Sequence, residues 1–398
     1  MSEWIECKIS DLGTVVGGAT PSTKKAENYE GGNIAWITPK DLSTFSGRYI
    51  QRGERNITEI GLKSCSTQLL PENTVLFSSR APIGYVAIAA NEVCTNQGFK
   101  SIIPNEETDP LFLFYLLKHN KDKIEAMGSG TTFKEVSGNT MKNIIVRVPS
   151  DKEVQNNIAS ILGTLDDKIE ENERINNNLE QQAMALFKSW FIDYEPFDGQ
   201  VPSTWKYGVL GDFVEIKRGG SPRPIQNFLS DSGLHWLKIS DATGISSPFI
   251  SEIKEYIIEE GLKKTVFLKA GSLVLSNSAT PGLPKILDID TCIHDGWLYF
   301  PSSKFSNEYL YLYFNHIRDN LVTLGNGSVF TNLKTDILKN YPTNLPTDEV
   351  LNEFDKIMKP IFSMILSTTR ESKRLTEIRD TLLPRLMSGE LDVSDLDL

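Results

Sequence analysis

The sequence is poor in cysteine, in long apolar runs and in net positive charge, and the first two shortages each exclude a class of protein. It has four cysteines in 398 residues and no CxxC pair, so neither a zinc ribbon nor a disulfide framework is expected. Its longest apolar runs, such as 111–117, are far shorter than the roughly 20 residues that cross a bilayer. The opening, MSEWIECK, is acidic where a secretory signal is basic. We therefore expect reduced cysteines and a cytoplasmic location.

Two motifs of enzymes that act on nucleic acids are also absent. The sequence has no N-P-P-[YF] segment of the kind that holds a flipped adenine in amino-methyltransferases. It also has no GxxxxGK[ST] loop that would bind the phosphates of ATP. We therefore predict that the chain is not an enzyme, and we assign it no catalytic residue, no metal ligand and no cofactor.

The shortage of positive charge is local. The net charge is −11, yet residues 1–150 hold 16 basic and 16 acidic side chains, and residues 201–347 hold 14 of each. The excess acidity falls in residues 151–200 and 348–398, with balances of −7 and −4. The two neutral segments can therefore present locally basic faces to phosphates, and the low pI does not exclude a nucleic-acid partner.

One pattern is written twice in the chain, at an offset that drifts from 201 to 197 residues. Residues 4–21 align with residues 205–222, and a period this long indicates a duplicated domain rather than a solenoid. Further matched pairs are Trp36 and Trp236, Asp41 and Asp241, Gly84 and Gly282, Cys94 and Cys292, and Gly98 and Gly296. The segments between them differ, as expected for two readers of different sequences, although surface drift after an old duplication explains this equally well.

Each copy begins with alternating, strand-like segments and Gly/Pro turns, and then continues into a helical run. We therefore predict an α+β fold with two duplicated mixed α/β domains, separated by two long helices packed as an antiparallel coiled-coil-like pair. The expected boundaries are 1–150 for the first domain and 151–196 for the first long helix. The second domain is expected over 197–347, and the second long helix with a C-terminal tail over 348–398.

The two long helices are predicted from apolar residues at three- and four-residue steps, which begin near Asp151 and near Thr347. Ser150 and Asp151, followed by Glu153, are typical of a helix start. Each helix would be about 60 Å long, at 1.5 Å for each of roughly 40 residues.

Some residues disturb this pattern. Gly163 lowers the helix propensity of the first helix, and Pro360 and Pro384 indicate a bend or a break in the second. Asn172 and residues 176–178, all asparagine, would cost stability inside a two-helix seam while fixing its register. Pairing of the two helices remains the simplest way to bury both apolar stripes, although each helix could instead fold back on its own domain.

The sequence resembles the specificity subunit of type I restriction-modification enzymes over nearly its whole length. The most specific stretches are residues 162–197 (LGTLDDKIEENERINNNLEQQAMALFKSWFIDYEPF) and residues 379–391 (RDTLLPRLMSGEL), which look like the spacer-helix motifs of that family. The repeated openings GGATPST and GGSPRP, together with SSRAPIG, are similar to its target-recognition framework.

The resemblance implies a subunit that binds double-stranded DNA with a two-part target and has no active site of its own. Two methyltransferase (modification) subunits would bind it, carry S-adenosylmethionine and methylate adenine N6 in each half of the target. Restriction subunits that use ATP and Mg²⁺ could join the assembly. The helices would set the distance between the two half-sites.

Base edges are read by Arg, Lys, Asn, Gln, Ser or Thr on loops, whereas phosphates take Lys and Arg with less geometric demand. The candidate DNA-binding residues of the first domain are Thr20, Ser22, Lys24, Lys25, Lys40, Arg48, Arg52, Arg55 and Arg80. Those of the second domain are Lys217, Arg218, Ser221, Arg223, Lys238, Lys263, Lys264 and Lys285. The candidate partner-binding residues on the helices are Asp166, Asp167, Glu170, Glu171, Glu173, Phe187, Trp190, Phe191, Leu383 and Leu386.

Two other functions fit part of the sequence. A stand-alone DNA-binding regulator would use the same two domains without an enzyme partner. A coiled-coil protein scaffold would explain the helices but not the duplicated domains. Neither the two half-site sequences nor the exact spacing between them follows from the sequence.

Overall fold

The computed structural model describes residues 3–80, 82–130, 134–325 and 332–393. Its internal contacts divide the chain into two compact units. Unit 1 comprises Met1–Glu170 with Arg374–Leu398, and unit 2 comprises Glu171–Lys373. The end of the predicted C-terminal tail, residues 394–398, lies outside the described residues.

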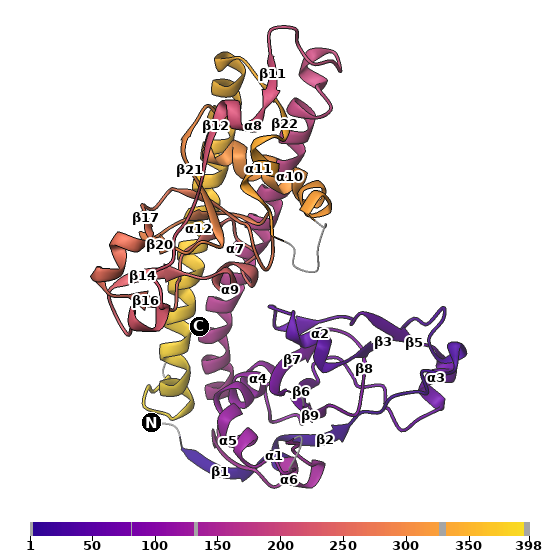
Figure 1. The fold of residues 1–398 in the computed structure, drawn as a ribbon. Coiled ribbons are helices and arrows are strands. Elements are labelled where there is room, and N and C mark those ends of the chain that lie inside the picture. The colour runs from indigo at the N-terminus through magenta and orange to yellow at the C-terminus, as the bar shows by residue number, and fades with distance from the viewer. Residues whose placement is uncertain (1–2, 81, 131–133, 326–331, 394–398) are drawn as a thin grey trace. The chain divides into compact units, whose positions relative to one another are not determined.

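Unit 1 is a mixed α and β structure that also contains the first part of one long helix and the last part of the other (Figure 1). Its described strands are β1 (Trp4–Lys8), β2 (Gly13–Gly17), β3 (Ile34–Ile37), β4 (Tyr49–Ile50), β5 (Arg55–Ile57), β6 (Val75–Ser79), β7 (Ile83–Ala89), β8 (Cys94–Thr95), β9 (Lys100–Pro104) and β10 (Ile145–Pro149). Its described short helices are α1 (Ile9–Leu12), η1 (Ala26–Asn28), α2 (Pro39–Ser43), α3 (Glu59–Lys63), α4 (Pro110–His119), α5 (Lys121–Ala126) and α6 (Gly138–Lys142).

Unit 2 repeats this arrangement. Its described strands are β11 (Lys206–Val209), β12 (Val214–Arg218), β13 (Leu229–Ser230), β14 (Leu234–Leu237), β15 (Phe249–Ile250), β16 (Tyr256–Ile257), β17 (Val266–Leu268), β18 (Leu273–Ser276), β19 (Pro284–Leu287), β20 (Thr291–Ile293), β21 (Trp297–Ser303) and β22 (Pro342–Leu345). Its described shorter helices are η2 (Glu195–Phe197), α8 (Leu210–Phe213), η3 (Ile225–Asn227), α9 (Ile239–Thr243), η4 (Glu259–Lys264), α10 (Asn307–Gly325) and α11 (Thr335–Lys339).

Within the described residues the larger sheets of the two units share one strand order, whereas the second sheet has three strands in unit 1 and five in unit 2. The larger sheet has the order β2-β9-β6-β7-β4 in unit 1 and β12-β21-β18-β19-β15 in unit 2. A second sheet places β3 between β5 and β8, and its counterpart places β14 between β16 and β20. The residues that repeat in the sequence occupy the same register, because Trp36 lies opposite Cys94 and Trp236 lies opposite Cys292, each in a parallel pair.

Two long helices, α7 (Lys152–Phe191) and α12 (Asp348–Met387), each contribute to both units (Figure 1). In unit 2 the Nδ2 atoms of Asn172 and Asn176 lie 2.8 Å from Glu371 Oε2 and 3.4 Å from Thr369 Oγ1. The contacted residue on α12 changes from Glu371 to Thr369 as the residue on α7 changes from Asn172 to Asn176, so the two helices are antiparallel there. The predicted α+β class, with its duplicated domains and paired long helices, is confirmed.

Of the bend or break predicted at the prolines of α12, the break is wrong, because one continuous helix runs through Pro360 and Pro384. Each proline removes one backbone hydrogen-bond donor from the helix, and α12 ends at Met387, shortly after Pro384. Pro360 lies between Met358 and Phe362, which are buried in the core of unit 2. That packing offsets the lost backbone hydrogen bond.

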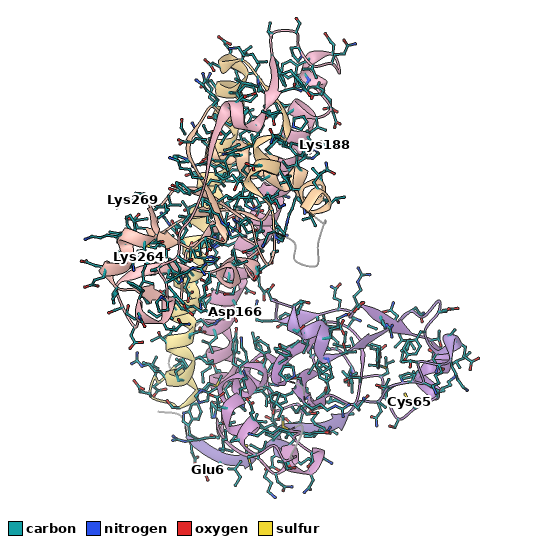
Figure 2. The ribbon with its side chains drawn as sticks, in the orientation of Figure 1. Glu6, Cys65, Asp166, Lys188, Lys264 and Lys269 are labelled. Carbon is teal, nitrogen blue, oxygen red and sulfur yellow. The ribbon has the colours of Figure 1, made fainter. Side chains whose placement is uncertain are left out.

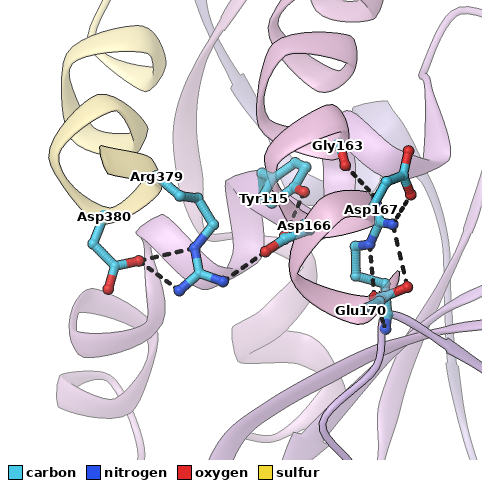
Figure 3. Close-up of polar contacts among 8 residues, drawn as sticks. Tyr115, Gly163, Asp166, Asp167, Glu170, Arg379 and Asp380 are labelled. Carbon is cyan, nitrogen blue, oxygen red and sulfur yellow. Dashed lines mark hydrogen bonds and ion pairs between the residues drawn. The ribbon is translucent and has the colours of Figure 1, made fainter. Parts of the chain in front are cut away.

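In unit 1 a buried carboxylate links α4 to both long helices (Figure 3). Asp166 Oδ2 accepts a 2.6 Å hydrogen bond from the Tyr115 hydroxyl, and its Oδ1 accepts one of 2.6 Å from Arg379 Nη1. Burial, followed by the charge of Asp166, raises the pKa of Tyr115. For Arg379, hydrogen bonds to Asp166 and Asp380 outweigh the effect of burial and raise its pKa. Asp166 on α7 therefore accepts hydrogen bonds from both α4 and α12.

Beside this network, Arg48 joins the segment before β4 to α7 through Gly163, Asp167 and Glu170, which are labelled in Figure 3. Its guanidinium donates to Gly163 O at 3.2 Å and to Glu170 Oε1 at 3.0 Å, and it also contacts Asp167. A Cβ atom at Gly163 would lie 3.0 Å from the Leu111 side chain. Gly163 lowers helix propensity, but the absence of its side chain lets Arg48 and Leu111 of α4 lie close to α7.

Candidate nucleic-acid interface

Most of the predicted DNA-binding residues of unit 1 are exposed around β2, η1 and the β3–β5 region. Exposed residues from this set are Thr20, Ser22, Lys24, Lys25, Lys40, Arg52 and Arg55. Lys40 forms an ion pair of 2.7 Å with Glu54, and the Arg55 guanidinium lies 5.8 Å from the centre of the Tyr29 ring. Side chains of Lys40 and Arg52 also line a shallow cavity of about 410 Å³.

Two arginines predicted to bind DNA in unit 1, Arg80 and Arg48, are less exposed to solvent than these residues. Arg80 is partly exposed, and its Nη1 atom lies 3.8 Å from Glu135 Oε2. The structure contradicts the candidate Arg48, because its side chain is only 5% exposed and its donors contact α7. A guanidinium committed to two carboxylates and a backbone carbonyl cannot reach a DNA groove without losing those bonds. Arg48 is a structural residue of unit 1.

In unit 2 the exposed candidates are Lys217, Arg218, Arg223, Lys263 and Lys264, whereas Ser221 and Lys238 are partly exposed. Lys264, the last residue of η4, and Lys269 lie on the same side of the unit in Figure 2.

The structure contradicts the candidate Lys285. This residue is 2% exposed, and its Nζ donates to Ile245 O at 2.7 Å and to Ser247 O. Burial lowers its pKa to about 8. The equivalent residue in unit 1 is the buried Ala87. Lys285 is therefore an internal support for the segment before β15 and not a phosphate ligand.

A polar cluster lies at the end of β20 in unit 2 and consists of Ser221, Arg223, His294 and Asp295. The Asp295 carboxylate accepts from Ser221 Oγ at 2.6 Å and from Arg223 Nη2 at 3.1 Å. His294 Nδ1 accepts from the backbone N–H of Gly296 at 2.8 Å. A neutral His294 therefore carries its proton on Nε2.

The equivalent polar cluster of unit 1 has the same frame and different chemistry. Thr20, which aligns with Ser221, bonds to the Gln97 side chain, and Gln97 stands where unit 2 has Asp295. Asn96 Oδ1 accepts from the backbone N–H of Gly98 at 2.8 Å, as His294 Nδ1 accepts from the equivalent glycine. Ser22 occupies the position of Arg223. Unit 1 thus has the uncharged Ser22 and Gln97 at the positions where unit 2 has Arg223 and Asp295.

The electrostatics of the unit 2 cluster are set by its neighbours. The Ser221 hydroxyl, helped by the charges of Arg218 and Arg223, holds the pKa of Asp295 below its ordinary value against the effect of burial. Burial lowers the pKa of His294. At neutral pH the cluster therefore holds an ionised carboxylate beside a neutral imidazole.

A cavity of about 800 Å³ adjoins this cluster in unit 2. Pro222, Trp236, Ile239 and Ala279 give it apolar walls, and Arg223, Lys238 and His294 contribute polar edges. An apolar hollow with a few polar groups at its rim suits the flat edge of a base or a methyl group better than a hydrated phosphate. Within the described residues, no group of three or more His, Cys, Asp or Glu side chains could hold a metal ion.

Gln97, His294 and Asp295 were missed because the candidates were chosen mainly for positive charge. A signal for them was present in the sequence. Each copy has two polar residues directly before a repeated glycine, Gly98 or Gly296. Repeated positions that keep polarity while changing chemistry are where two related binding surfaces would differ.

The comparison with known families agrees with this duplication. The model of the type I restriction modification DNA specificity domain matches residues 1–181 and again residues 202–378. The chain belongs to the type I restriction-modification specificity family. Its two matched segments fall in the two copies of one fold that the structure contains.

Relatives of this specificity-family chain match it over nearly their full length. The type I restriction enzyme MjaIX specificity subunit of Methanocaldococcus jannaschii is 35% identical, over 99% of this chain and 95% of the relative. The HindI specificity subunit of Haemophilus influenzae is 25% identical, over 98% of this chain and 100% of the relative. The crystal structure of the S subunit from M. genitalium shares the fold, with a TM-score of 0.64 and 16% identity over 97% of this chain and 96% of that chain.

The helix residues predicted to bind partners of this specificity-family chain fall into two groups. Four of them are buried, which contradicts their prediction as surface residues. Phe187, Phe191 and Leu386 lie in the apolar cores of the units, and Asp166 is bonded to Tyr115 and Arg379. The others remain accessible in part or in full: Asp167, Glu170, Glu171, Glu173, Trp190 and Leu383. Asp167 and Glu170 pair with Arg48, and Glu171 lies 2.7 Å from Arg174.

Among the described residues, no helix combines the length and the apolar character of a membrane-spanning segment.

Proposed function

We propose that this chain is the DNA sequence-specificity subunit of a type I restriction-modification complex, in which each unit reads one half of a split, asymmetric target. The observation that carries the proposal is the pair of polar clusters. One strand frame, repeated with the same register, presents Thr20 and Gln97 in unit 1 but Ser221 and Asp295 in unit 2. Two scaffolds with unlike polar groups at equivalent positions would recognise two unlike base sequences.

The long helices would set the distance between the half-sites and bind the adenine-N6 methyltransferase subunits. A helix of 40 residues is about 60 Å long, which suits a rigid spacer. The accessible acidic side chains of α7, such as Glu171 and Glu173, disfavour contact with DNA phosphates and fit a protein partner instead. S-adenosylmethionine would be carried by that partner, and ATP with Mg²⁺ by a restriction subunit, so the chain itself would catalyse no step.

Methylation-sensitive sequencing of the host genome, with and without the gene for this chain, tests the proposal. We expect a methylated motif made of two unlike blocks separated by a fixed gap, and we expect it to disappear when the gene is deleted. Reintroducing the gene should restore it. A motif that persists without the gene, or that forms one continuous block, would contradict the proposal. Occupancy of DNA without any dependent methylation would favour the stand-alone regulator.

A further inference from the structure

The polar cluster of unit 2 presents one arginine, hydrogen-bonded to a carboxylate, at an open surface. Arg223 lies between β12 and η3, and its side chain is 78% exposed. One of its nitrogens, Nη2, donates to Asp295 Oδ2 at 3.1 Å. Among the described residues, no other side chain bonds to this guanidinium, so its remaining N–H groups face solvent.

Asp295, whose carboxylate holds Arg223, is itself held from several sides through its side chain and its backbone. Ser221 Oγ donates to Asp295 Oδ1 at 2.6 Å, and Asn277 Nδ2 donates to the Asp295 carbonyl at 3.2 Å. The backbone N–H of Asp295 lies 3.3 Å from Ser221 Oγ, and Arg218 Nε donates to the same carbonyl. An arginine fixed by a positioned carboxylate loses less side-chain entropy when it binds.

Two DNA groups can accept a fork of N–H donors, the O6/N7 edge of guanine and a phosphate. The surroundings of Arg223 favour guanine. Asp295 neutralises much of the positive charge and would repel a phosphate, whereas it does not oppose a neutral base. The adjoining cavity has apolar walls at Pro222 and Trp236 that can contact a base, and the lysine at its rim, Lys238, is already paired with Glu255.

We propose that Arg223, positioned by Asp295, reads a guanine in the half-site bound by unit 2. The inference rests on the proposed function and adds the identity of one base. Unit 1 has no arginine at this place, since Ser22 stands there, and its cluster presents the neutral Gln97. Glutamine pairs with the N6/N7 edge of adenine rather than with guanine. Guanine recognition through this position is therefore specific to unit 2.

The test uses the complex purified from its host through a tag on the full-length chain, together with the subunits that remain bound. Wild type, Arg223→Ala, Arg223→Lys and the matched unit 1 variant Ser22→Ala each select from a pool of randomised DNA duplexes. We expect Arg223→Ala to lower the preference for guanine at one position of one block by about 10-fold or more. Arg223→Lys should lower it by less, because the lysine ammonium can still donate to guanine O6 and N7 but lacks the planar fork. Ser22→Ala should leave that position unchanged.

Each result decides between the inference and a simpler role. If Arg223→Ala weakens all duplexes equally and Arg223→Lys restores binding, Arg223 contacts a phosphate and the inference is overturned. Retained guanine preference in both variants overturns it as well. If wild type selects no sequence at all, the proposed function fails, which is a separate result. Lys269→Ala, which alters an exposed lysine paired with Asp290 in the same unit, controls for loss of surface charge, and thermal unfolding confirms that each variant is folded.

Discussion

In unit 1 a carboxylate, a phenol and a guanidinium meet where α4 packs on the long helices, whereas the equivalent place in unit 2 is apolar. The helices α7 and α12 have the same length, so Asp166 aligns with Phe362 and Arg379 aligns with Ala183. Tyr115 of α4 aligns with Leu312 of α10. All three unit 2 residues belong to one buried apolar cluster. Duplicated frames of one fold are thus stabilised by charge pairing in one copy and by apolar packing in the other.

This difference shows that the ionic contacts of unit 1 are not required by the fold. A buried ion pair repays its desolvation only when every charge has its partner, whereas apolar packing has no such condition. At this place unit 1 should therefore be sensitive to the loss of a single charge, and unit 2, whose three aligned residues are apolar, should not. The largest expected effect follows directly.

Arg379→Met should destabilise unit 1 by about 3 kcal/mol, because it leaves the buried Asp166 without its cation. Hydrogen exchange resolved to peptides should speed up in α4 of unit 1 and stay unchanged in α10 of unit 2. Arg385→Met is the matched control, since it removes an exposed arginine of the same helix that pairs with Glu390, and its effect should be within about 0.5 kcal/mol. Equal effects of the two variants would show that the Asp166 contact contributes little.

The second comparison concerns the position of Lys285, which in unit 2 bonds to the segment just before strand β15. Unit 2 has Lys285 there and unit 1 has Ala87. The folded-state pKa of Lys285, about 8, lies below its ordinary value of 10.5. The unfolded chain therefore binds more protons between these values, and this residue makes the wild type more stable as the pH rises from about 8 to about 10. Above that range the buried tyrosines with raised pKa, such as Tyr309, oppose the trend.

Lys285→Met should remove this contribution, which is about 2 kcal/mol at most over the stated range. Urea-unfolding midpoints of wild type and variant, measured at about pH 8 and about pH 10, give the difference between their pH slopes. Lys269→Met, at an exposed lysine of the same unit, should keep the wild-type slope. A wild-type slope in Lys285→Met would mean that Lys285 remains charged when buried.

Features with a local or repeated signal were predicted well. The apolar periodicity and the acidic cap predicted α7 within one residue of its start, where Asp151 Oδ1 accepts from the Glu153 N–H at 2.9 Å. The repeated Trp36 and Cys94 predicted an equivalence that the sheet register confirms. Periodicity and repetition are properties of the chain itself, so no tertiary information is needed to detect them.

Features that depend on distant partners were not predicted. Arg48 was selected for its charge, yet its partners lie more than 100 residues away on α7. Lys285 and Asp166 failed for the same reason, since exposure is set by which elements pack against a residue. Proline was overweighted at Pro360, because local rules do not include the core packing that holds the helix together. Residue type indicates what a side chain can do, and packing decides where it does so.

The smallest net effect is expected from transplanting the apolar solution into unit 1. The triple variant Asp166→Phe, Tyr115→Leu and Arg379→Ala removes the charges together, so no buried group is left without a partner. Replacing a complete buried ion network by apolar residues of similar volume is often neutral or stabilising. We expect the triple variant to lie within about 1 kcal/mol of wild type and well above Arg379→Met, which requires strong coupling among the three sites. Peptide-resolved hydrogen exchange in α4 measures this recovery. If the triple variant is as unstable as the single one, the surroundings in unit 1 are adapted to the charges, and the two units would not be interchangeable at this position.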